Sequence, residues 1–470
     1  MRKKQKQEII IKDLHIIEAG SEGVCIGKYE DRVVFVPYVV PQDVVDVQVF
    51  KKKKSYYHAK AIEIKEHSPN RVSPKCEHFG LCGGCKWQNM DYDTQLFYKQ
   101  KQVIDNFQRI GKFDFPQVNP ILASDLIFAY RNKVEYTFSN RRWLRKEEIP
   151  DADAGNINTN GLGFHLPEMF DKILDINHCY LHDDLGNEIR NAVKDYAIRH
   201  SLQFWNARSQ TGFLRNLIIR NSDCGDVMVI VVLTSFTAQA EDLLKFISEK
   251  FPQITSLLYV ENSKKNDSIA DLSTKTYSGK DFLQQIMGDL KFKVAPLAFY
   301  QTNSAQAFKL YLQTARLADI NETQTVYDLY TGTGTIALFV AKSAKKVIGI
   351  EYVESAIESA KENASLNNIH NAFFFAGDMT AMLCDEFIAK NGNPDVIITD
   401  PPRCGMHPKV IEQLLKILPE RIVYVSCNPA TQARDIAMLN SKYEVKEVQP
   451  VDMFPHTHHV ENIALLVRNC

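Results

Sequence analysis

The sequence lacks any hydrophobic run long enough to cross a membrane, which takes about 20 consecutive apolar residues. Its basic start, residues 1–5, is not followed by the apolar core that marks a signal peptide. The chain also has almost no net charge, only −1, because 56 Lys and Arg residues stand against 57 Asp and Glu residues. Such a balance neither favours nor excludes a nucleic-acid partner. We therefore expect a cytoplasmic, monomeric protein with no membrane partner.

The positive charge that is present is concentrated near the N-terminus. Residues 1–75 hold 15 Lys and Arg against 10 Asp and Glu, and Lys51 to Lys54 form an uninterrupted run. Lysine runs of this kind can contact phosphates, although a solvated loop explains a single run equally well. The chain has 470 residues, of which 45% are hydrophobic and 24% charged, and this is enough for two to four folded domains.

A glycine-rich stretch, residues 326–340, reads as a buried strand, a glycine turn and the start of a helix. Gly332 and Gly334 remove β-carbons where the backbone must approach a ligand, and a helix N-terminus favours negative charge there. Glu351 ends the next predicted strand, where a carboxylate can hold ribose hydroxyls. Taken alone, the Gly-x-Gly-x-x-Ala pattern fits NAD as well as S-adenosylmethionine.

Two further predicted strands favour S-adenosylmethionine. Residues 372–378 end in Asp378, a carboxylate suited to the amino group of adenine. Residues 395–402 end in Asp400-Pro-Pro, where a reactive centre could lie at the carboxyl end of a parallel strand. This succession resembles the class I methyltransferase fold. The alternative is a doubly wound domain whose acids only cap helices.

The N-terminal part of the chain alternates apolar and polar residues in short segments. Five such strands within about sixty residues predict a small closed barrel of the OB type. The region also resembles a TRAM domain, an RNA-binding barrel, with Pro41-Gln-Asp where that family usually has Pro-Gly-Asp. The expected strands are 8–11, 23–27, 33–37, 44–49 and 59–64.

Three cysteines lie close together directly after this barrel. Cys76, Cys82 and Cys85 fall within ten residues, the last two on either side of Gly-Gly. In a cytosolic chain such cysteines are more often reduced thiols than disulfides, and this grouping indicates a metal site. The spacing itself leaves zinc and an iron–sulfur cluster open, and each would need a fourth ligand.

The middle of the chain is predicted to be an α+β region that binds RNA. Basic and aromatic side chains alternate between residues 128 and 146, which suits the phosphates and splayed bases of unpaired RNA. Residues 147–160 are expected to form a loop. The predicted fold is thus α/β and multidomain: a barrel (1–67), a central α+β insert with the cysteine segment (68–295) and a Rossmann-like methyltransferase domain (296–470).

Two cysteines compete for the chemistry in the last of these parts. Cys404 follows Asp-Pro-Pro-Arg, whereas Cys427 lies in Ser-Cys-Asn-Pro-Ala-Thr. Cys427 follows an apolar strand and precedes an Asn-Pro turn, so its thiol is expected at the carboxyl end of that strand. A buried cysteine without function is the commonest fate of this residue type, and only the flanking motifs argue otherwise.

Taken in order, the CGGC, DPPR and SCNPAT motifs resemble the RumA branch of the RNA (uracil-5-)-methyltransferases. The resemblance implies that Cys427 is the nucleophile and Glu461 the base, with S-adenosylmethionine as cofactor and 23S ribosomal RNA as substrate. It also implies a [4Fe–4S] cluster held by Cys76, Cys82, Cys85 and Cys179. Because a free thiol is only a few per cent ionised at neutral pH, we expect the site to lower the pKa of Cys427 or to stabilise its adduct. The expected cofactor-binding residues are Gln301, Tyr330, Gly332, Glu351, Asp378 and Asp400.

Three other readings stay open. An RNA cytosine carbon-5 methyltransferase would place a cysteine near Cys404, but Glu461 and the clustered cysteines do not fit it. A non-catalytic RNA-binding protein could share the fold without keeping the reactive residues. The transfer RNA branch of the same family is the third, and it usually lacks both the barrel and the cysteine segment.

Overall fold

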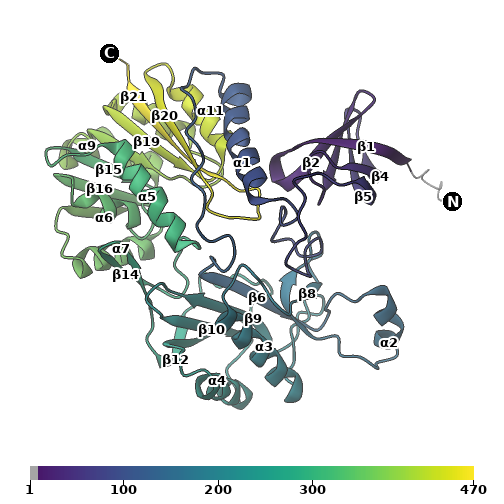
Figure 1. Cartoon of the computed structure of the whole chain (residues 1–470). Coiled ribbons are helices and arrows are strands. Elements are labelled where there is room, and N and C mark those ends of the chain that lie inside the picture. The colour runs from purple at the N-terminus through teal and green to yellow at the C-terminus, as the bar shows by residue number, and fades with distance from the viewer. Residues whose placement is uncertain (1–8, 470) are drawn as a thin grey trace.

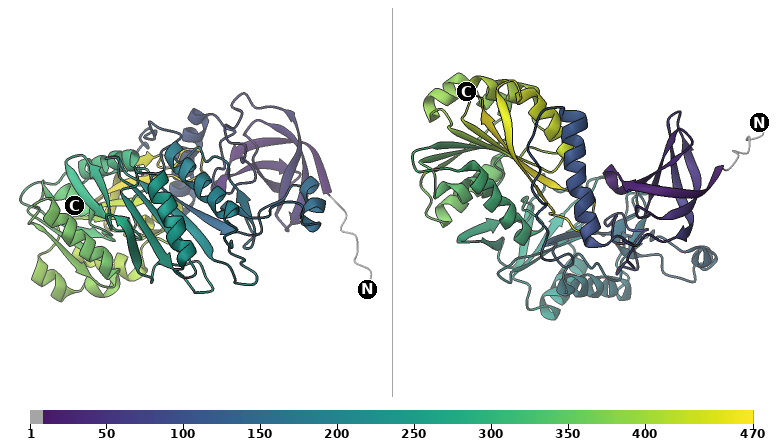
Figure 2. Two further views of the ribbon diagram at one scale, coloured as in Figure 1. Left: turned by 90° about the horizontal axis from the view of Figure 1, so that it is seen from below. Right: turned by 45° about the horizontal axis from the view of Figure 1, so that its top comes forward.

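The computed structural model describes residues 9–469, whose strands form a closed barrel, two seven-stranded sheets and a short hairpin. Figure 1 shows the barrel on the right, the central sheet below and the C-terminal sheet at the upper left. The two further views in Figure 2 show that the barrel and the C-terminal sheet are separate parts of the molecule. No helix among residues 9–469 is long and apolar enough to cross a membrane.

The N-terminal barrel closes because its first and fourth strands pair, giving the order β1-β2-β3-β5-β4. Alternate side chains fill its interior: Val34, Val36 and Ala59 are fully buried. The predicted closed barrel is therefore confirmed. Its strands are β1 (Ile9–Ala19), β2 (Val24–Tyr29), β3 (Arg32–Pro37), β4 (Val44–Lys52) and β5 (Tyr56–Glu66), with the short helix η1 (Ser21–Gly23) before β2.

Helix α1 (Tyr92–Asn106) and the π-helical turn η2 (Phe107–Gly111) follow the cysteine segment and lie against the C-terminal sheet (Figure 1). Phe107 is fully buried in the same hydrophobic core as residues of that sheet. Farther along, Leu122 N donates to Pro450 O at 3.0 Å, and Asp452 N donates to Leu122 O at 2.9 Å. Residues 92–122 therefore pack on the C-terminal sheet although they precede the central sheet in sequence.

The central sheet has the order β12-β11-β10-β9-β6-β7-β8, and α3 (Asp184–Arg199) and α4 (Ala238–Lys250) pack on it in one core. The loop predicted for 147–160 is wrong in its first part, where η3 (Lys146–Glu148) and α2 (Ile149–Asp153) form. Pro150 lies in the first turn of α2, where a missing N–H costs no hydrogen bond. The strands are β6 (Lys133–Ser139), β7 (Gly161–His165), β8 (Ile173–Asp175), β9 (Leu214–Asn221), β10 (Val227–Leu233), β11 (Ser256–Glu261) and β12 (Thr274–Gly279).

A hairpin of β13 (Leu283–Met287) and β14 (Leu290–Val294) leads into the C-terminal sheet, whose order is β17-β16-β15-β18-β19-β21-β20. The sheet is parallel except for β21, which runs antiparallel to both of its neighbours. The strand order reverses between β15 and β18, and ligands bind at the carboxyl ends of strands beside such a switch point. The predicted Rossmann-like domain is confirmed. Its strands are β15 (Thr325–Leu329), β16 (Lys346–Glu351), β17 (Ala372–Ala376), β18 (Val396–Thr399), β19 (Arg421–Ser426), β20 (Tyr443–Val451) and β21 (Glu461–Arg468).

Helices cover both faces of this sheet, as the parallel arrangement requires. In Figure 1, α5 and α6 lie in front of the strands or below them, and α11 lies beside β20 next to α1. The helices are α5 (Ser304–Ala318), α6 (Thr335–Ala341), α7 (Glu354–Leu366), α8 (Met379–Met382), α9 (Asp385–Asn391), α10 (Pro408–Ile417) and α11 (Pro429–Leu439).

Candidate active site

The glycine turn between β15 and α6 is strongly bent. Tyr330, Gly332 and Gly334 all have left-handed φ angles, of +64°, +54° and +81°. A β-carbon on Gly334 would lie 2.9 Å from the β-carbon of Ala360, so this glycine is required for packing. A β-carbon on Gly332 would meet nothing within 4 Å, so the backbone there faces open space that a ligand can approach closely.

Asp328, which the sequence analysis did not single out, holds this turn in place. Its fully buried carboxylate accepts hydrogen bonds from the hydroxyl of Thr331 and from Ala337 N, the latter at 3.0 Å. Burial raises the pKa of Asp328 to about 7. A single carboxylate within an otherwise apolar strand was the signal that could have identified it.

Two of the predicted cofactor acids lie at the carboxyl ends of neighbouring strands. Glu351, at the end of β16, accepts a hydrogen bond from Gly332 N at 3.2 Å and another from Tyr352 N at 2.8 Å. Asp378 follows β17 and caps α8 through Thr380 N at 2.9 Å. Hydrogen bonds from Thr380 hold the pKa of Asp378 below its usual value, so the group stays ionised. The glycine turn and both acids thus lie together at the carboxyl ends of three neighbouring strands, β15, β16 and β17.

The two remaining predicted cofactor residues, Gln301 before α5 and Asp400 after β18, both lie near Tyr311. The pKa of buried Tyr311 is raised by burial and by the nearby carboxylate of Asp400, while Gln301 acts in the opposite direction. Both side chains are therefore close to one tyrosine. Asn132 Nδ2, from the central region, donates to Gln301 O at 2.9 Å and to Ser304 Oγ at 2.7 Å, which fixes the approach to α5.

Cys427 and Glu461 face each other across two antiparallel strands. Cys427 follows β19 and immediately precedes α11, whose Asn428 side chain accepts from Ala430 N at 3.1 Å. Glu461 begins β21, which pairs with β19 in a register that sets Ser426 opposite Asn462. The next pair in this register is Cys427 and Glu461, so these two residues lie beside each other at the ends of the two strands.

Electrostatics in this site favour neutral side chains. Burial, with a further contribution from Asp400, raises the pKa of Glu461 to about 8, and Arg403 opposes the shift. Burial raises the pKa of Cys427 to about 11, and Glu461 and Asp400 add to it. Burial alone raises the pKa of Asp400 to about 7. The expectation that the site lowers the pKa of the thiol is therefore wrong for the protein alone, which leaves stabilisation of the adduct.

The other candidate cysteine, Cys404, is exposed on the loop after β18. That loop is bound to the Cys427 loop, because Asn428 Nδ2 donates to Arg403 O at 3.0 Å and Thr431 Oγ1 donates to the same oxygen at 3.2 Å. Arg403 thereby lies where it can act on both Cys427 and Glu461.

The four cysteines proposed as metal ligands line a single cavity of about 200 Å³, between the segment that precedes α1 and the loop that precedes α3. Burial raises the pKa of Cys82 to about 11 and that of Cys85 to about 12, and the neighbouring thiols add to both shifts. No three His, Cys, Asp or Glu side chains within residues 9–469 are arranged to hold a single metal ion. The cavity is formed by Cys76, Cys82, Cys85 and Cys179 together with residues that include Gln88, Arg131 and Tyr180.

Comparison with known proteins decides the family. Residues 272–469 match the family described as tRNA (Uracil-5-)-methyltransferase, and residues 2–62 match the TRAM domain. An RNA methyltransferase of Bacteroides thetaiotaomicron is 56% identical over 95% of this chain and 99% of its own length. One of Porphyromonas gingivalis is 48% identical over 97% of this chain and 100% of its own length. The chain belongs to the RNA (uracil-5-)-methyltransferase family.

A solved structure agrees with this assignment over nearly the whole chain. The tRNA (uracil-54, C5)-methyltransferase of Pyrococcus abyssi, in complex with S-adenosyl-L-homocysteine, is 28% identical. It covers 97% of this chain and 100% of its own, with a TM-score of 0.75. The predicted enzyme class, an S-adenosylmethionine-dependent RNA (uracil-5-)-methyltransferase, is thereby confirmed.

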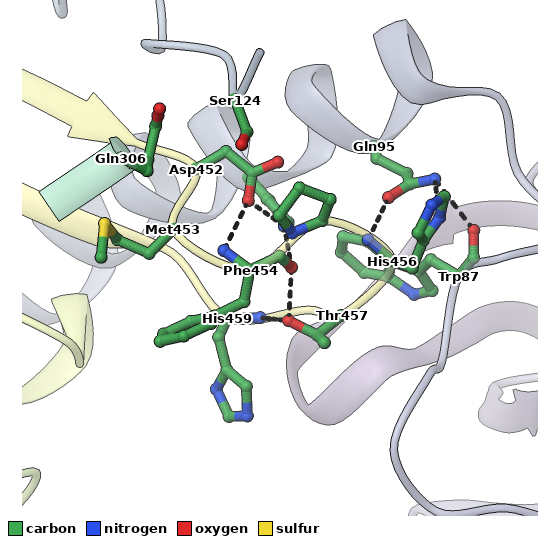
Figure 3. A network of polar contacts seen from close by, with 12 residues as sticks. Trp87, Gln95, Ser124, Gln306, Asp452, Met453, Phe454, His456, Thr457 and His459 are labelled. Atoms are coloured by element: carbon green, nitrogen blue, oxygen red, sulfur yellow. Dashed lines mark hydrogen bonds and ion pairs between the residues drawn. The ribbon is translucent and has the colours of Figure 1, made fainter. Parts of the chain in front are cut away.

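In this methyltransferase, residues 452–460 form a turn (the 452–460 turn) that leads directly to Glu461 and is held by α1 (Figure 3). Lys99 Nζ donates to Asp452 Oδ1 at 2.5 Å and to Phe454 O at 3.0 Å, and the Lys99 and Asp452 side chains are fully buried. Gln95 Oε1 accepts from His456 N at 2.8 Å. Sequence analysis missed both α1 residues because their partners lie more than 300 positions away.

The same turn of the methyltransferase touches the cysteine segment and the barrel. Lys86 N and Trp87 N, directly after Cys85, donate to His456 O at 2.9 and 3.0 Å. Trp87 Nε1 donates to Gly23 O at 3.3 Å, and a β-carbon on Gly23 would lie 3.2 Å from His458 Nδ1. Barrel, cysteine segment and α1 therefore meet at the turn that carries the candidate base.

Proposed function

We propose that the enzyme methylates carbon 5 of a uridine through a covalent adduct between Cys427 and carbon 6. The observation that carries the proposal is the proximity of Cys427 and Glu461, which follows from the pairing of β19 with β21. Glu461 raises the pKa of Cys427, and Asp400 raises the pKa of both groups. A nucleophile and a base this close, beside a cofactor edge, suit a reaction that needs both.

Each residue has a distinct task in this scheme. Carbon 5 of uracil is a poor nucleophile, but addition of the Cys427 thiolate to carbon 6 forms an enolate and makes carbon 5 reactive. After carbon 5 has been methylated, Glu461 removes its proton, the double bond reforms and the thiolate leaves with its electron pair. Arg403 provides positive charge that opposes the rise in the pKa of both groups.

The glycine turn, with the acids around it, is proposed to bind S-adenosylmethionine, which supplies the methyl group. Gly332 leaves open space beside the backbone, and Glu351 is held next to it by the Gly332 N–H. An ionised Asp378 suits the adenine amino group, while Tyr330, Gln301 and Asp400 complete the proposed cofactor residues.

The two cysteines provide the test of the mechanism. With RNA that carries 5-fluorouridine, the wild-type enzyme should form an adduct that survives a denaturing gel, because no proton can be removed from carbon 5. Cys427→Ala should form no adduct and lose methyl transfer altogether, whereas the matched control Cys404→Ala should keep both. On ordinary RNA, Glu461→Gln should accumulate the adduct. An adduct that persists in Cys427→Ala would overturn the assignment.

We further propose 23S ribosomal RNA as the substrate. The CGGC, DPPR and SCNPAT motifs in this order support the proposal, since they resemble the ribosomal branch of the family. The Pyrococcus abyssi structure favours transfer RNA as a second candidate, because that protein is a tRNA methyltransferase and aligns with 97% of this chain. Mass mapping of both RNAs from a deletion strain should show a 5-methyluridine missing from 23S RNA. Its loss from transfer RNA alone would select the second candidate.

The cysteine cavity is proposed to hold a [4Fe–4S] cluster. Four thiols around one cavity of about 200 Å³ are the donor set that such a cluster requires. Anaerobically purified enzyme should be brown and contain about four iron and four sulfide per chain. Cys179→Ser should lose iron, whereas Cys224→Ser, at an exposed cysteine, should not. A colourless protein with one zinc would contradict the proposal.

The nine cysteines in the described chain form no disulfide, which is compatible with a cytoplasmic enzyme, and we propose that it acts as a monomer. Gel filtration of the purified enzyme tests the second point directly, and elution at the mass of a dimer would refute it.

A further inference from the structure

Four aromatic side chains gather on the outside of the barrel, on three neighbouring strands. Phe35 lies on β3, Phe50 on β4, and Tyr56 and His58 lie on β5. The pairing of β3 with β5 sets Phe35 next to His58, and the pairing of β4 with β5 sets Lys51 on the other side of His58. Along these strands the alternate residues Val34, Val36 and Ala59 fill the barrel interior. The rings of Phe35, Phe50, Tyr56 and His58 therefore point outward.

The rings form one continuous surface. The centre of the His58 ring lies 5.5 Å from that of Phe35 and 6.2 Å from that of Phe50, with interplanar angles of 32° and 30°. Tyr56 meets His58 edge-on at 5.4 Å. Phe50 is 62% exposed, so the barrel core does not explain an aromatic residue there.

Positive charge borders these rings. Lys51 to Lys54 follow Phe50 directly, complete β4 and form the turn into β5, and all four are exposed. Exposed aromatic faces next to a cationic rim are the combination by which proteins bind single-stranded nucleic acid, with bases on the rings and phosphates at the cations.

We propose that Phe35, Phe50, Tyr56 and His58 (the aromatic platform) bind an unpaired segment of the substrate RNA outside the catalytic pocket, with Lys51 to Lys54 contacting its phosphates. The platform rests on RNA being the substrate, and not on the identity of that RNA or on the Cys427 mechanism. Stacking tolerates any base, so the platform contributes affinity for unpaired RNA and little sequence preference.

Binding of a fluorescent, unstructured 15-nucleotide RNA to the full-length enzyme, without methyl donor, tests the platform. Replacing Phe50 and His58 by Ala should raise the Kd about tenfold and leave its salt dependence unchanged, because stacking carries no charge. Replacing Lys51 to Lys54 by Gln should lower the slope of log K against log salt by up to about 2.8. Phe50→Tyr keeps the ring and should bind like the wild type.

The matched control is Phe373→Ala, since Phe373 is an exposed phenylalanine on β17 with Lys346 Nζ 5.4 Å from its ring. It should bind RNA like the wild type. An unchanged Kd in the Phe50 and His58 variant, or an equal loss in Phe373→Ala, would overturn the platform. Should the double variant melt early, Phe50→Ser alone decides, because that side chain is mostly exposed. Since no methylation is measured, a failure of the Cys427 mechanism would leave this result intact.

Discussion

Glu461 holds its proton far more tightly than an ordinary glutamate, because its carboxyl is buried next to Asp400. With a pKa of about 8, it is mostly protonated at neutral pH in the protein alone. In the proposed mechanism, only the deprotonated form can accept the carbon 5 proton. The rate at which the methylated adduct releases Cys427 should therefore follow the ionisation of this one residue.

That rate should rise with pH up to about 8 and level off above it. Below the pKa, each pH unit should change the rate about tenfold, because the deprotonated fraction changes by that factor. Pulse-chase measurement of adduct decay between pH 6 and pH 9 provides the check. Glu461→Asp, which keeps a carboxylate, should show a slower but still rising profile, whereas Glu461→Gln should be slow and flat. A flat profile in the wild type would exclude Glu461 as the base.

At this scale the sequence indicates candidate reactive residues more readily than supporting ones. Cys427 and Gly332 stand in short motifs whose chemistry can be argued locally. Asp328 and Lys99 carry no such motif, since their partners are set by the fold: a backbone N–H of α6 for Asp328, and an aspartate from the other end of the chain for Lys99.

Helix α1 holds the turn that leads to Glu461, the proposed base. Lys99→Met would leave Asp452 buried and unpaired, which should lower the free energy of unfolding by about 3–5 kcal/mol. It should also slow adduct release, because the 452–460 turn loses an anchor. Adding Asp452→Asn removes the uncompensated charge and should restore much of the stability. Urea unfolding of each variant, together with adduct decay, gives both quantities.

The control lies two residues farther along the same helix. Lys101 forms ion pairs with Asp105 at 2.6 Å and with Glu18 at 3.1 Å in a partly exposed position, where such pairs contribute about 1 kcal/mol or less each. Lys101→Met should therefore leave stability and adduct release nearly unchanged. Equal losses in both variants would show that α1 tolerates no loss of a lysine, and would remove the case for a special role of Lys99.

Elements with a strong period were predictable, and short polar ones were not. The five barrel strands and the parallel strands of the C-terminal sheet follow from alternating or continuous apolar residues. The helical turn at Ile149–Asp153 buries no residue, so no apolar pattern marks it, and its polar sequence with Pro150 was taken for a loop.

Across the whole molecule, the barrel contacts the 452–460 turn, which leads to the proposed base, through Gly23. Gly23→Val should press on Lys86 and His458, where a β-carbon would lie 2.7 Å from Lys86 Cβ. We expect adduct release to slow about tenfold, equivalent to 1.4 kcal/mol of barrier, while S-adenosylmethionine affinity stays unchanged. Gly155→Val is the matched control, since Gly155 has a similar φ of +75° but open space around it. Equal rates in both variants would contradict the connection.

The barrel, the methyltransferase sheet and their order along the chain could be predicted from sequence, because each depends on local periodicity and ordered motifs. The limits at residues 67 and 295 stay a prediction. The packing of residues 92–122 on a sheet formed by the last third of the chain could not be predicted. No pattern in that segment indicates which part of the chain it packs against.

This packing means that the polypeptide does not need to be continuous to stay together. A single protease cut at the exposed Asp125–Leu126 segment would give one piece with the barrel, the cysteine segment and α1, and another with both large sheets. The pieces would remain joined by the shared core around Phe107 and by the buried Lys99–Asp452 pair. The enzyme should accordingly work as a split protein, assembled in the cell from two separately encoded halves.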